Sequence, residues 1–527
     1  MRILQEVRHD IKVADAVRAE LLTRNRLLPP RWGDLALIDH VEAISDWFRS
    51  LMRRDFEVHS EDILLARKLG RGARPLSLLG LQERILYRGA IALVEAAAQV
   101  SSNRGFEEYE AFQQAPLQVQ GCRYVLKADI ASYYQYIDHE RLVDEVVAQT
   151  GDDLAVSTAT DLLHGATGRA YGLPQLNTSS DVLAEIYIEP MRRALIRSGF
   201  VAYRFADDFR VACRTYAEAL AAWEAADSAA RDLGLVLNES KTSTPGLARY
   251  AASLTELHDQ EQQLFQDLDV ERLDTFPYSE TEDEQTQIEI TALLAESEFD
   301  GGEVTTEPEP GIEIAVPSDA QMTAADRVFD RWLAEEEDEE TQRRESAHVT
   351  ASLLQRALRV FGSAGESSAL RHVTSLLVYE PSLTPTISRY LIQCIEEHRS
   401  EVTDALNDAC ESRVMNAWQC AWISYVAGSL PRRRRRRTAE TSPPHVEWLK
   451  EQSRNSNPAL AAESILALAR RRLVTIEEVS AVLSRLTSVQ RPTGIIALAA
   501  LGDERVALNA APTSIDRMRV QWAIEHL

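Results

Sequence analysis

The sequence has few of the features that crosslink a chain or anchor it in a membrane. Its five cysteines are spread over 527 residues without paired spacing, which excludes a disulfide scaffold and a cysteine-rich zinc module. No apolar run is long enough to cross a membrane, and the first ten residues lack the apolar core of a signal peptide. We therefore expect a cytoplasmic protein with no membrane partner.

Excess charge is also scarce outside one segment. The formal net charge is −25, yet residues 251–350 alone contain 29 Asp and Glu against 5 Lys and Arg. The rest of the chain is therefore close to neutral. An acidic total ordinarily argues against a nucleic-acid partner, but that argument fails here because a single segment supplies the charge.

Length and pattern predict several domains rather than one core. We expect a mostly helical region over residues 1–120, an α/β region over 121–255, an acidic linker or insertion over 256–345 and an all-helical region over 346–527. The short paired helices of the last region are typical of a helical-repeat array, although their spacing has no fixed period.

Six consecutive arginines, Arg432–Arg437, interrupt the all-helical region. Such a run cannot be buried and predicts an exposed loop. The run by itself fits a phosphate-binding loop and a merely solvated loop equally well.

The α/β region alternates short β-like runs with helical ones. Strands are predicted over 122–128, 201–205 and 209–213, and helices over 182–196 and 217–233. This order predicts a small antiparallel sheet packed against helices.

Three carboxylates stand at the ends of these predicted strands. Asp129 follows the first strand, and Asp207 and Asp208 lie between the other two. Adjacent carboxylates repel each other, and a divalent cation would compensate for that repulsion. Mg²⁺ prefers a few carboxylates plus phosphate oxygens, and two such ions can hold the attacking and leaving oxygens of a phosphoryl transfer. An Asp pair in a turn that binds no metal is the alternative that these residues alone leave open.

Four segments, in order, resemble the motifs of reverse transcriptases. Residues 129–139 resemble motif A, Gly172-Leu-Pro-Gln175 resembles motif B, Phe205-Ala-Asp-Asp208 resembles motif C and residues 233–242 resemble motif D. The resemblance covers about residues 65–250. It implies an α/β (α+β) polymerase palm and fingers of reverse-transcriptase type, followed here by an all-α helical-repeat domain.

The resemblance implies catalytic residues. Asp129, Asp207 and Asp208 would hold two Mg²⁺ ions, with Mn²⁺ as an alternative. Lys241 would lie near the triphosphate of the incoming nucleotide and could protonate the leaving pyrophosphate. The implied activity is that of an RNA-directed DNA polymerase, a nucleotidyltransferase that consumes dNTPs and produces DNA.

The resemblance also implies substrate-binding residues. Tyr134 would pack under the sugar, where its ring excludes a 2′-hydroxyl, and Gln175 would lie beside the incoming base. One of the basic residues Lys68, Arg71 and Arg74 would contact the triphosphate.

Two positions depart from the family pattern. Leu176 stands where a glycine is usual, and Glu185 stands where many members have asparagine. The Leu-Ala-Glu form, together with a helical array in place of a thumb, resembles the bacterial defence-associated, abortive-infection-like "unknown group" of reverse transcriptases. That resemblance implies antiphage defence and a homo-oligomer. Some members of the group make untemplated DNA primed from the protein, whereas others copy a noncoding RNA partner.

Two readings of another class compete with a polymerase. One is an RNA-binding or effector-binding protein with a silent polymerase domain, which the intact Asp triad and Lys241 argue against. The other is a nuclease effector with an Arg-x4-His pair, a spacing found at Arg54 and His59 and again at Arg343 and His348.

Overall fold

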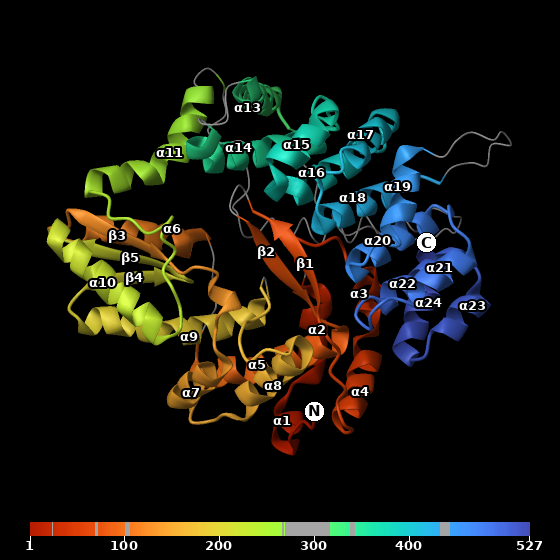
Figure 1. The fold of residues 1–527 in the computed structure, drawn as a ribbon, viewed down its shortest axis with the longest axis horizontal. Coiled ribbons are helices and arrows are strands. Elements are labelled where there is room, and N and C mark those ends of the chain that lie inside the picture. The colour runs from red at the N-terminus through yellow and green to blue at the C-terminus, as the bar shows by residue number, and fades with distance from the viewer. Residues whose placement is uncertain are drawn as a thin grey trace, which may run out of the picture. The chain divides into compact units, whose positions relative to one another are not determined.

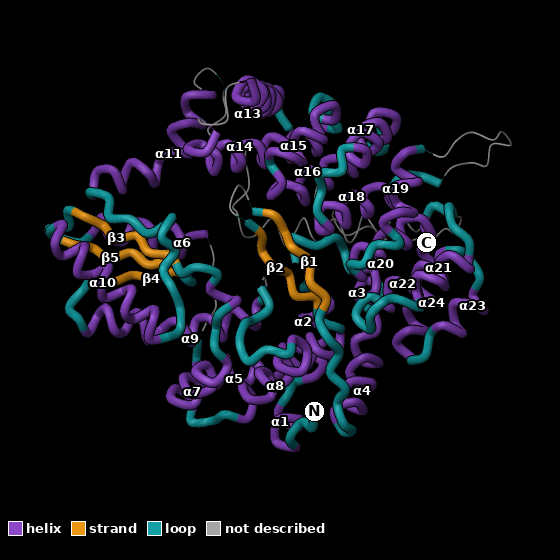
Figure 2. Tube along the Cα trace, in the orientation of Figure 1, coloured by secondary structure: helices purple, strands orange, loops and turns teal. Residues whose placement is uncertain are grey.

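The structure is a computed structural model. It describes residues 1–23, 25–68, 72–100, 106–175, 177–265, 268, 317–337, 343–432 and 443–527. Most of the acidic segment predicted as a linker, as well as Arg71, Leu176 and the arginines from 433 to 437, lies outside the described residues. The described part is largely helical with two small sheets (Figure 2). None of its helices is both long and apolar enough to cross a lipid bilayer.

The chain divides into two compact units, which are described separately. The first comprises residues 1–20, 41–61 and 79–257, and the second comprises residues 21–40, 62–78 and 258–527. The chain thus passes between the units several times. Figure 1 shows the elements of both.

The first unit consists of helices around one sheet, and two of these helices, α2 and α11, cross its boundary. Its helices are α1 (Gln5–Asp10), α2 (Val13–Leu22), α4 (Val41–Met52), α5 (Leu81–Ala98), α6 (Phe106–Gln114), α7 (His139–Thr150), α8 (Leu154–Thr167), α9 (Thr178–Arg197), α10 (Tyr216–Asp232) and α11 (Leu247–Phe265), with 3₁₀ turns η2 (Ala115–Gln118) and η3 (Tyr133–Gln135).

The sheet of the first unit has three antiparallel strands in the order β3-β5-β4. These are β3 (Tyr124–Asp129), β5 (Asp208–Cys213) and β4 (Val201–Phe205). The predicted strands are confirmed: that over 201–205 has the predicted bounds, and the bounds of the other two differ by up to two residues. The predicted helices correspond to α9 and α10.

Helices cover both faces of this sheet. Helices α9 and α10 pack on the strands and on each other. Along β5, Asp208, Arg210 and Ala212 share one face because successive side chains of a strand alternate. Ala212 packs in a buried cluster with Tyr250 of α11, and the Arg210 guanidinium lies over the ring of Phe112 of α6, 5.1 Å from its centroid.

The second unit is an array of helices that also contains a β-hairpin. Its elements are α3 (Trp32–Leu35), η1 (Ile38–His40), β1 (Asp62–Arg67), β2 (Ala73–Leu78), α13 (Asp319–Glu337), α14 (Arg343–Ala364), η4 (Leu370–His372), α15 (Val373–Tyr379), η5 (Pro381–Leu383), α16 (Thr384–Gln393), α17 (Arg399–Glu411), α18 (Ala417–Ser429), α19 (Pro444–Gln452), α20 (Pro458–Arg470), α21 (Ile476–Leu483), α22 (Arg491–Ala500), α23 (Glu504–Ala510) and α24 (Ser514–His526).

Alternate helices of this array pack in succession. Helices α14, α16, α18, α20, α22 and α24 each contact the next in that series. Helices α18 and α20 approach each other closely at Gly428, where a Cβ would lie 2.9 Å from the Cα of Ala467.

Helix starts in the array hold the β-hairpin. Asn416 caps α18 through its side-chain oxygen and donates from Nδ2 to the carbonyl of Leu65 at 2.7 Å. Asn457 caps α20 in the same way and donates to the carbonyl of Ile63 at 3.1 Å. Each asparagine therefore satisfies a helix terminus and a strand carbonyl at once.

The close approach of α18 and α20 generates a stability prediction. Gly428→Val forces side-chain atoms against the backbone of α20, and such overpacking typically costs about 1–3 kcal/mol. The control is Ala481→Val, at an exposed position of α21, which should cost only a few tenths of a kcal/mol, since helix propensity alone changes there. Urea unfolding of both variants tests this expectation, and equal losses would contradict it.

Candidate active site

Strand register brings the three predicted carboxylates together. Asp129, the last residue of β3, pairs with Asp208, the first residue of β5. Asp207 precedes Asp208 in a two-residue turn that joins β4 to β5, with Phe205 paired to Asp208. The sheet thus gathers all three at one end, as the sequence predicted.

Asp129 is buried and both of its carboxylate oxygens are bonded. Lys241 donates from Nζ to Oδ1 at 3.2 Å, and Asn238 donates from Nδ2 to Oδ2 at 2.9 Å. The chain positions both donors because residues 236–246 run along the outer edge of β3. There Lys127 and Ser243 exchange two backbone hydrogen bonds. Lys241 therefore lies beside the triad, whereas Asn238 was not among the predicted site residues.

Burial, reinforced by charge repulsion, dominates the electrostatics of the site. Burial, followed by repulsion from Asp129 and Asp208, raises the pKa of Asp207 to about 6. Burial also raises the pKa of Asp208, and the nearby Arg210 guanidinium partly offsets that rise, with Nη1 at 3.6 Å from the Asp208 carboxylate. A half-buried site with excess negative charge attracts cations.

An ion-pair network supports the turn that carries Asp207. Arg204 of β4 donates from Nη1 to the carbonyl of Ala206 at 3.0 Å, and its guanidinium pairs with Glu185 at 2.6 Å and Glu189 at 3.6 Å. Ala206 has φ 50°, a left-handed conformation that costs a non-glycine residue energy. The network thus holds a strained turn in place and gives Glu185, the departure from the family pattern, a physical partner.

Tyr134 lies in a short segment that is packed against motif B. Its hydroxyl donates to the Asp181 carboxylate of α9 at 2.5 Å, and its carbonyl accepts from the Leu173 amide at 2.8 Å. Gly172 has φ 93°, and a Cβ there would lie 3.2 Å from the Gln135 carbonyl. Only glycine suits that position. Gln175 is half-buried and comes two residues before Asn177, the N-cap of α9.

His139 adds a side-chain link between motifs A and B. Its Nε2 donates to the Gly172 carbonyl at 2.8 Å, and burial lowers its pKa. The N-cap of α7 is the neighbouring Asp138, whose side chain accepts from the Arg141 amide. Asp138 therefore caps α7, whereas His139, the first residue of that helix, bonds to motif B.

The predicted basic residues belong to the other compact unit. Lys68 is exposed at the end of β1, with its amide bonded to the Gly72 carbonyl at 2.9 Å, and Arg74 is half-buried on β2. Arg71 lies outside the described residues. Lys68 and Arg74 thus belong to a different compact unit from the three carboxylates.

The donor set suits a hard divalent cation, although it is not arranged as a finished metal site. Among the residues that the structure describes, no three His, Cys, Asp or Glu side chains form a group that could hold a metal ion. Lys241 and Asn238 instead occupy the oxygens of Asp129. Carboxylate oxygens are the ligands that Mg²⁺ prefers, and a cation would relieve the repulsion that raises the pKa of Asp207.

His59, one of the two histidines with the Arg-x4-His spacing, is bonded to a glutamate of α5. The amide and Nδ1 of His59 both lie 2.9 Å from Oε1 of the buried Glu83, which raises the pKa of the imidazole. This contact ties the histidine to α5. The side chains of Arg343 and His348 lie outside the described residues.

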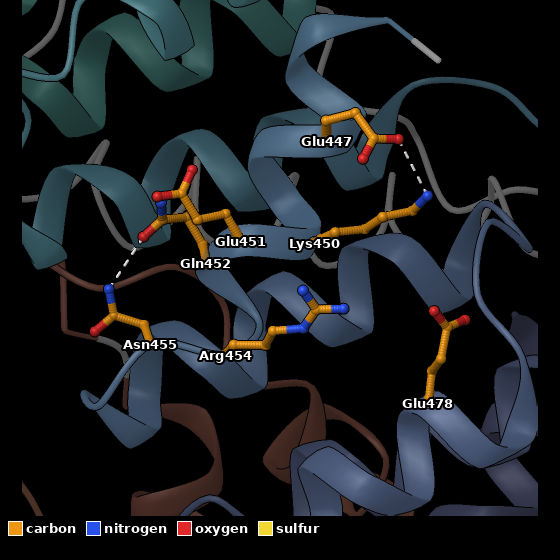
Figure 3. Close-up of a pocket in the computed structure, with 7 residues that line it drawn as sticks. All are labelled: Glu447, Lys450, Glu451, Gln452, Arg454, Asn455 and Glu478. Atoms are coloured by element: carbon orange, nitrogen blue, oxygen red, sulfur yellow. Dashed lines mark hydrogen bonds and ion pairs between the residues drawn. The ribbon is translucent and has the colours of Figure 1, made fainter. Parts of the chain in front are cut away.

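A polar cavity in the second unit contains none of the predicted site residues. Its volume is about 620 Å³. Both charge signs line it, and Lys450 pairs with Glu447 at 3.1 Å (Figure 3). We assign it no role in the chemistry.

The comparison with protein families agrees with the motifs. Residues 66–249 match the family described as "Reverse transcriptase (RNA-dependent DNA polymerase)", which includes the whole sheet and Lys241. The chain therefore contains a reverse transcriptase domain over these residues. That domain indicates an RNA-directed DNA polymerase, a nucleotidyltransferase that acts on nucleotides and nucleic acid. A search of curated proteins found no match.

Removal of the Asp207 charge should raise the stability of the protein and lower its activity. A folded-state pKa of about 6, against an ordinary value of 3.8, means that ionised Asp207 destabilises the fold at neutral pH. Without Mg²⁺, Asp207→Asn should raise the free energy of unfolding at pH 7 by about 1–2 kcal/mol. The gain should grow from pH 4 to pH 6 and then level off. Nucleotide incorporation should fall at least about 100-fold.

The matched control is Asp227→Asn, which removes a half-buried carboxylate bonded to Arg231 at 2.8 Å. It should change stability by less than about 0.5 kcal/mol and leave incorporation intact. Destabilisation by Asp207→Asn at pH 7 would contradict the repulsion argument.

The network behind the turn generates a second prediction. Glu185→Gln weakens the ion pair that holds Arg204 against the strained Ala206, so kcat should fall about tenfold, or about 1.4 kcal/mol. KM for the nucleotide should change much less. Steady-state incorporation measures both constants. Glu224→Gln, a change at an exposed position of α10, should alter neither constant. An unchanged kcat for Glu185→Gln, or the same loss of kcat in both variants, would contradict this role.

Proposed function

We propose that this chain is a reverse-transcriptase-type DNA polymerase that acts in antiphage defence of the abortive-infection kind. The observation that carries the polymerase activity is the register of Asp129 with Asp208, which gathers three carboxylates and Lys241 at one end of the sheet. A polymerase uses such a cluster to add deoxynucleotides by phosphoryl transfer with two metal ions.

The proposed reaction joins a hydroxyl oxygen to the α-phosphorus of a dNTP and breaks its bond to the pyrophosphate oxygen. Asp129, Asp207 and Asp208 would hold two Mg²⁺ ions, or Mn²⁺, which supply charge stabilisation for the attacking and leaving oxygens. The attacking hydroxyl gives up its proton to solvent, and Lys241 donates a proton to the leaving pyrophosphate. The Lys241 side chain is 47% exposed, so its ammonium group is free to leave Asp129 for an incoming triphosphate.

Tyr134 is the proposed selector of deoxynucleotides. Its hydroxyl bond to Asp181 and its contact with the ring of Tyr133, at 5.5 Å between centroids, restrict the movement of the ring. A fixed ring under the sugar excludes a 2′-hydroxyl by contact. Gln175 would border the base, and one of Lys68, Arg71 and Arg74 would bind the triphosphate.

The proposed organisation has four parts. Residues 121–255 form the palm, residues 1–120 contribute the fingers, residues 256–345 are an acidic linker or insertion, and residues 346–527 form a helical-repeat domain. The succession of packed helices from α14 to α24 supports the last assignment. We propose that the protein is cytoplasmic and acts as a homo-oligomer.

The defence role rests on the Leu-Ala-Glu form of motif B and on the helical array in place of a thumb. The proposed priming is from a hydroxyl of the protein itself, without a template. The alternative within this function is a polymerase that copies a noncoding RNA partner. The alternative of another class, an RNA-binding or effector-binding protein with a silent polymerase domain, is disfavoured because all three aspartates and Lys241 are present.

The test incubates the purified full chain with Mg²⁺ and each labelled dNTP in turn, with no added template or primer. Label that migrates with the protein, and is released as DNA by protease, is the expected result for protein priming. Label on co-purifying RNA or DNA would replace protein priming with an external primer. An Asp207→Ala/Asp208→Ala variant is the control, and incorporation by that variant would overturn the assignment of the active site. Absence of incorporation even with added primer, RNA template and all dNTPs would favour the silent-domain alternative.

A further inference from the structure

Three exposed arginines gather in the second unit where helices α18 and α20 end. Arg432 follows α18 and donates from Nε to the carbonyl of Arg470, the last residue of α20, at 3.1 Å. Arg399, the first residue of α17, donates from Nη2 to the carbonyl of Pro431 at 3.3 Å. The third is Arg472, whose charge acts directly on Arg432. We call Arg399, Arg432 and Arg472 the arginine cluster.

Carboxylates do not neutralise this cluster. Within the described ranges, no member forms an ion pair with Asp or Glu. Two glutamates, Glu397 and Glu401, lie two positions from Arg399 in sequence, and Glu401 is bonded instead to His398 at 2.8 Å. Partial burial and repulsion from Arg472 lower the pKa of Arg432, so the members repel one another.

Helix geometry explains how the cluster tolerates this repulsion. The bonds that Arg399 and Arg432 make go to backbone carbonyls just after α18 and at the end of α20. Carbonyls at a helix C-terminus carry partial negative charge and stabilise cations without cancelling their net charge. The positive charge therefore remains available to a ligand.

The arginines that precede Arg472 in the sequence pack against other side chains, whereas Arg472 is exposed. Arg470 lies over the ring of Trp32, 4.3 Å from its centroid, and Arg471 is buried, with Nη1 3.0 Å from Nε2 of His445. Arg472, the next residue, is exposed. Of three consecutive arginines, the first two are built into the packing and the third is directed to the surface. The sequence continues from Arg432 into five further arginines, which lie outside the described residues.

We propose that the arginine cluster binds the phosphate backbone of a nucleic-acid strand, at a site separate from the polymerase carboxylates. Guanidinium groups match phosphate oxygens through paired hydrogen bonds, and cations that no carboxylate neutralises release the counterions condensed on a nucleic acid when they bind its phosphates. Nucleic acid is the polyanion that a chain with a reverse transcriptase domain meets. The site reads no bases, so DNA and RNA of one sequence should both bind.

The test measures binding rather than incorporation, so a silent polymerase domain would not affect it. The full chain is titrated against fluorescent single-stranded DNA and RNA of about 30 nucleotides, in EDTA and without dNTPs, at salt from about 50 to 300 mM. The variant Arg399→Gln/Arg432→Gln/Arg472→Gln should weaken binding of both strands at least about tenfold at 0.1 M salt. The slope of log affinity against log salt should fall by about 2, since each phosphate contact on a single strand contributes about 0.7.

Two matched variants make the result specific. Arg454→Gln/Arg505→Gln/Arg517→Gln removes the same charge from exposed positions of the same unit and should leave the slope unchanged. Arg399→Lys/Arg432→Lys/Arg472→Lys keeps the charge and should retain the slope. Thermal melting checks the fold of each variant. A cluster variant with the slope of the unchanged protein, or a control variant that loses as much slope as the cluster variant, would overturn the proposal.

Discussion

Like charges gathered at the end of a small sheet are the constraint on which the rest of this site depends. The register of β3 on β5 sets Asp129 against Asp208, and the turn adds Asp207. Each of the two strand residues has a cation nearby: Lys241 at 3.2 Å from Asp129 and Arg210 at 3.6 Å from Asp208. Burial, followed by repulsion from the other two aspartates, raises the pKa of Asp207. The turn that carries Asp207 is held by Arg204, which donates to the Ala206 carbonyl. Arg204 is in turn paired with Glu185 of α9, so residues of that helix also support the site. The site is stabilised by its surroundings and is strained in itself.

The aspartates and the three strands could be predicted from sequence because their signals are local. Apolar runs that end in an acidic residue place the carboxylates at strand ends, and the motifs lie in short contiguous segments. The supporting network had no such signal. Glu185 and Arg204 come from different elements, and nothing in either segment records that they pair. Arg210 lies inside an otherwise apolar strand and pairs with a residue two positions before it, so alternation along β5 could have revealed it.

The long-range contacts of the β1–β2 hairpin could not be predicted from the sequence either. The bonds from Asn416 to Leu65 and from Asn457 to Ile63 join residues 351 and 394 positions apart. Propensity and spacing describe neighbours along the chain, and an asparagine before a helix predicts only a cap. Its second hydrogen bond depends on the tertiary fold. For the same reason, the number of arginines in the sequence does not reveal how much positive charge the surface carries. Arg204 is paired with a carboxylate, Arg470 lies over a tryptophan ring, and Arg432 bonds to a backbone carbonyl.

The way that the chain passes between the two units has a consequence for its biosynthesis. Residues 21–40 belong to the unit completed by α24, where Arg519 donates from Nε to the carbonyl of Gly33, 486 residues earlier. At roughly 5–20 residues per second, a ribosome needs about half a minute or more to make the partner of that segment. During this time Trp32 and Leu27 have no helices to pack against, since their contacts are with Trp418, Trp422 and Trp522. The nascent chain therefore carries exposed apolar surface near its beginning until synthesis of α24 ends, and only then can this unit bury it.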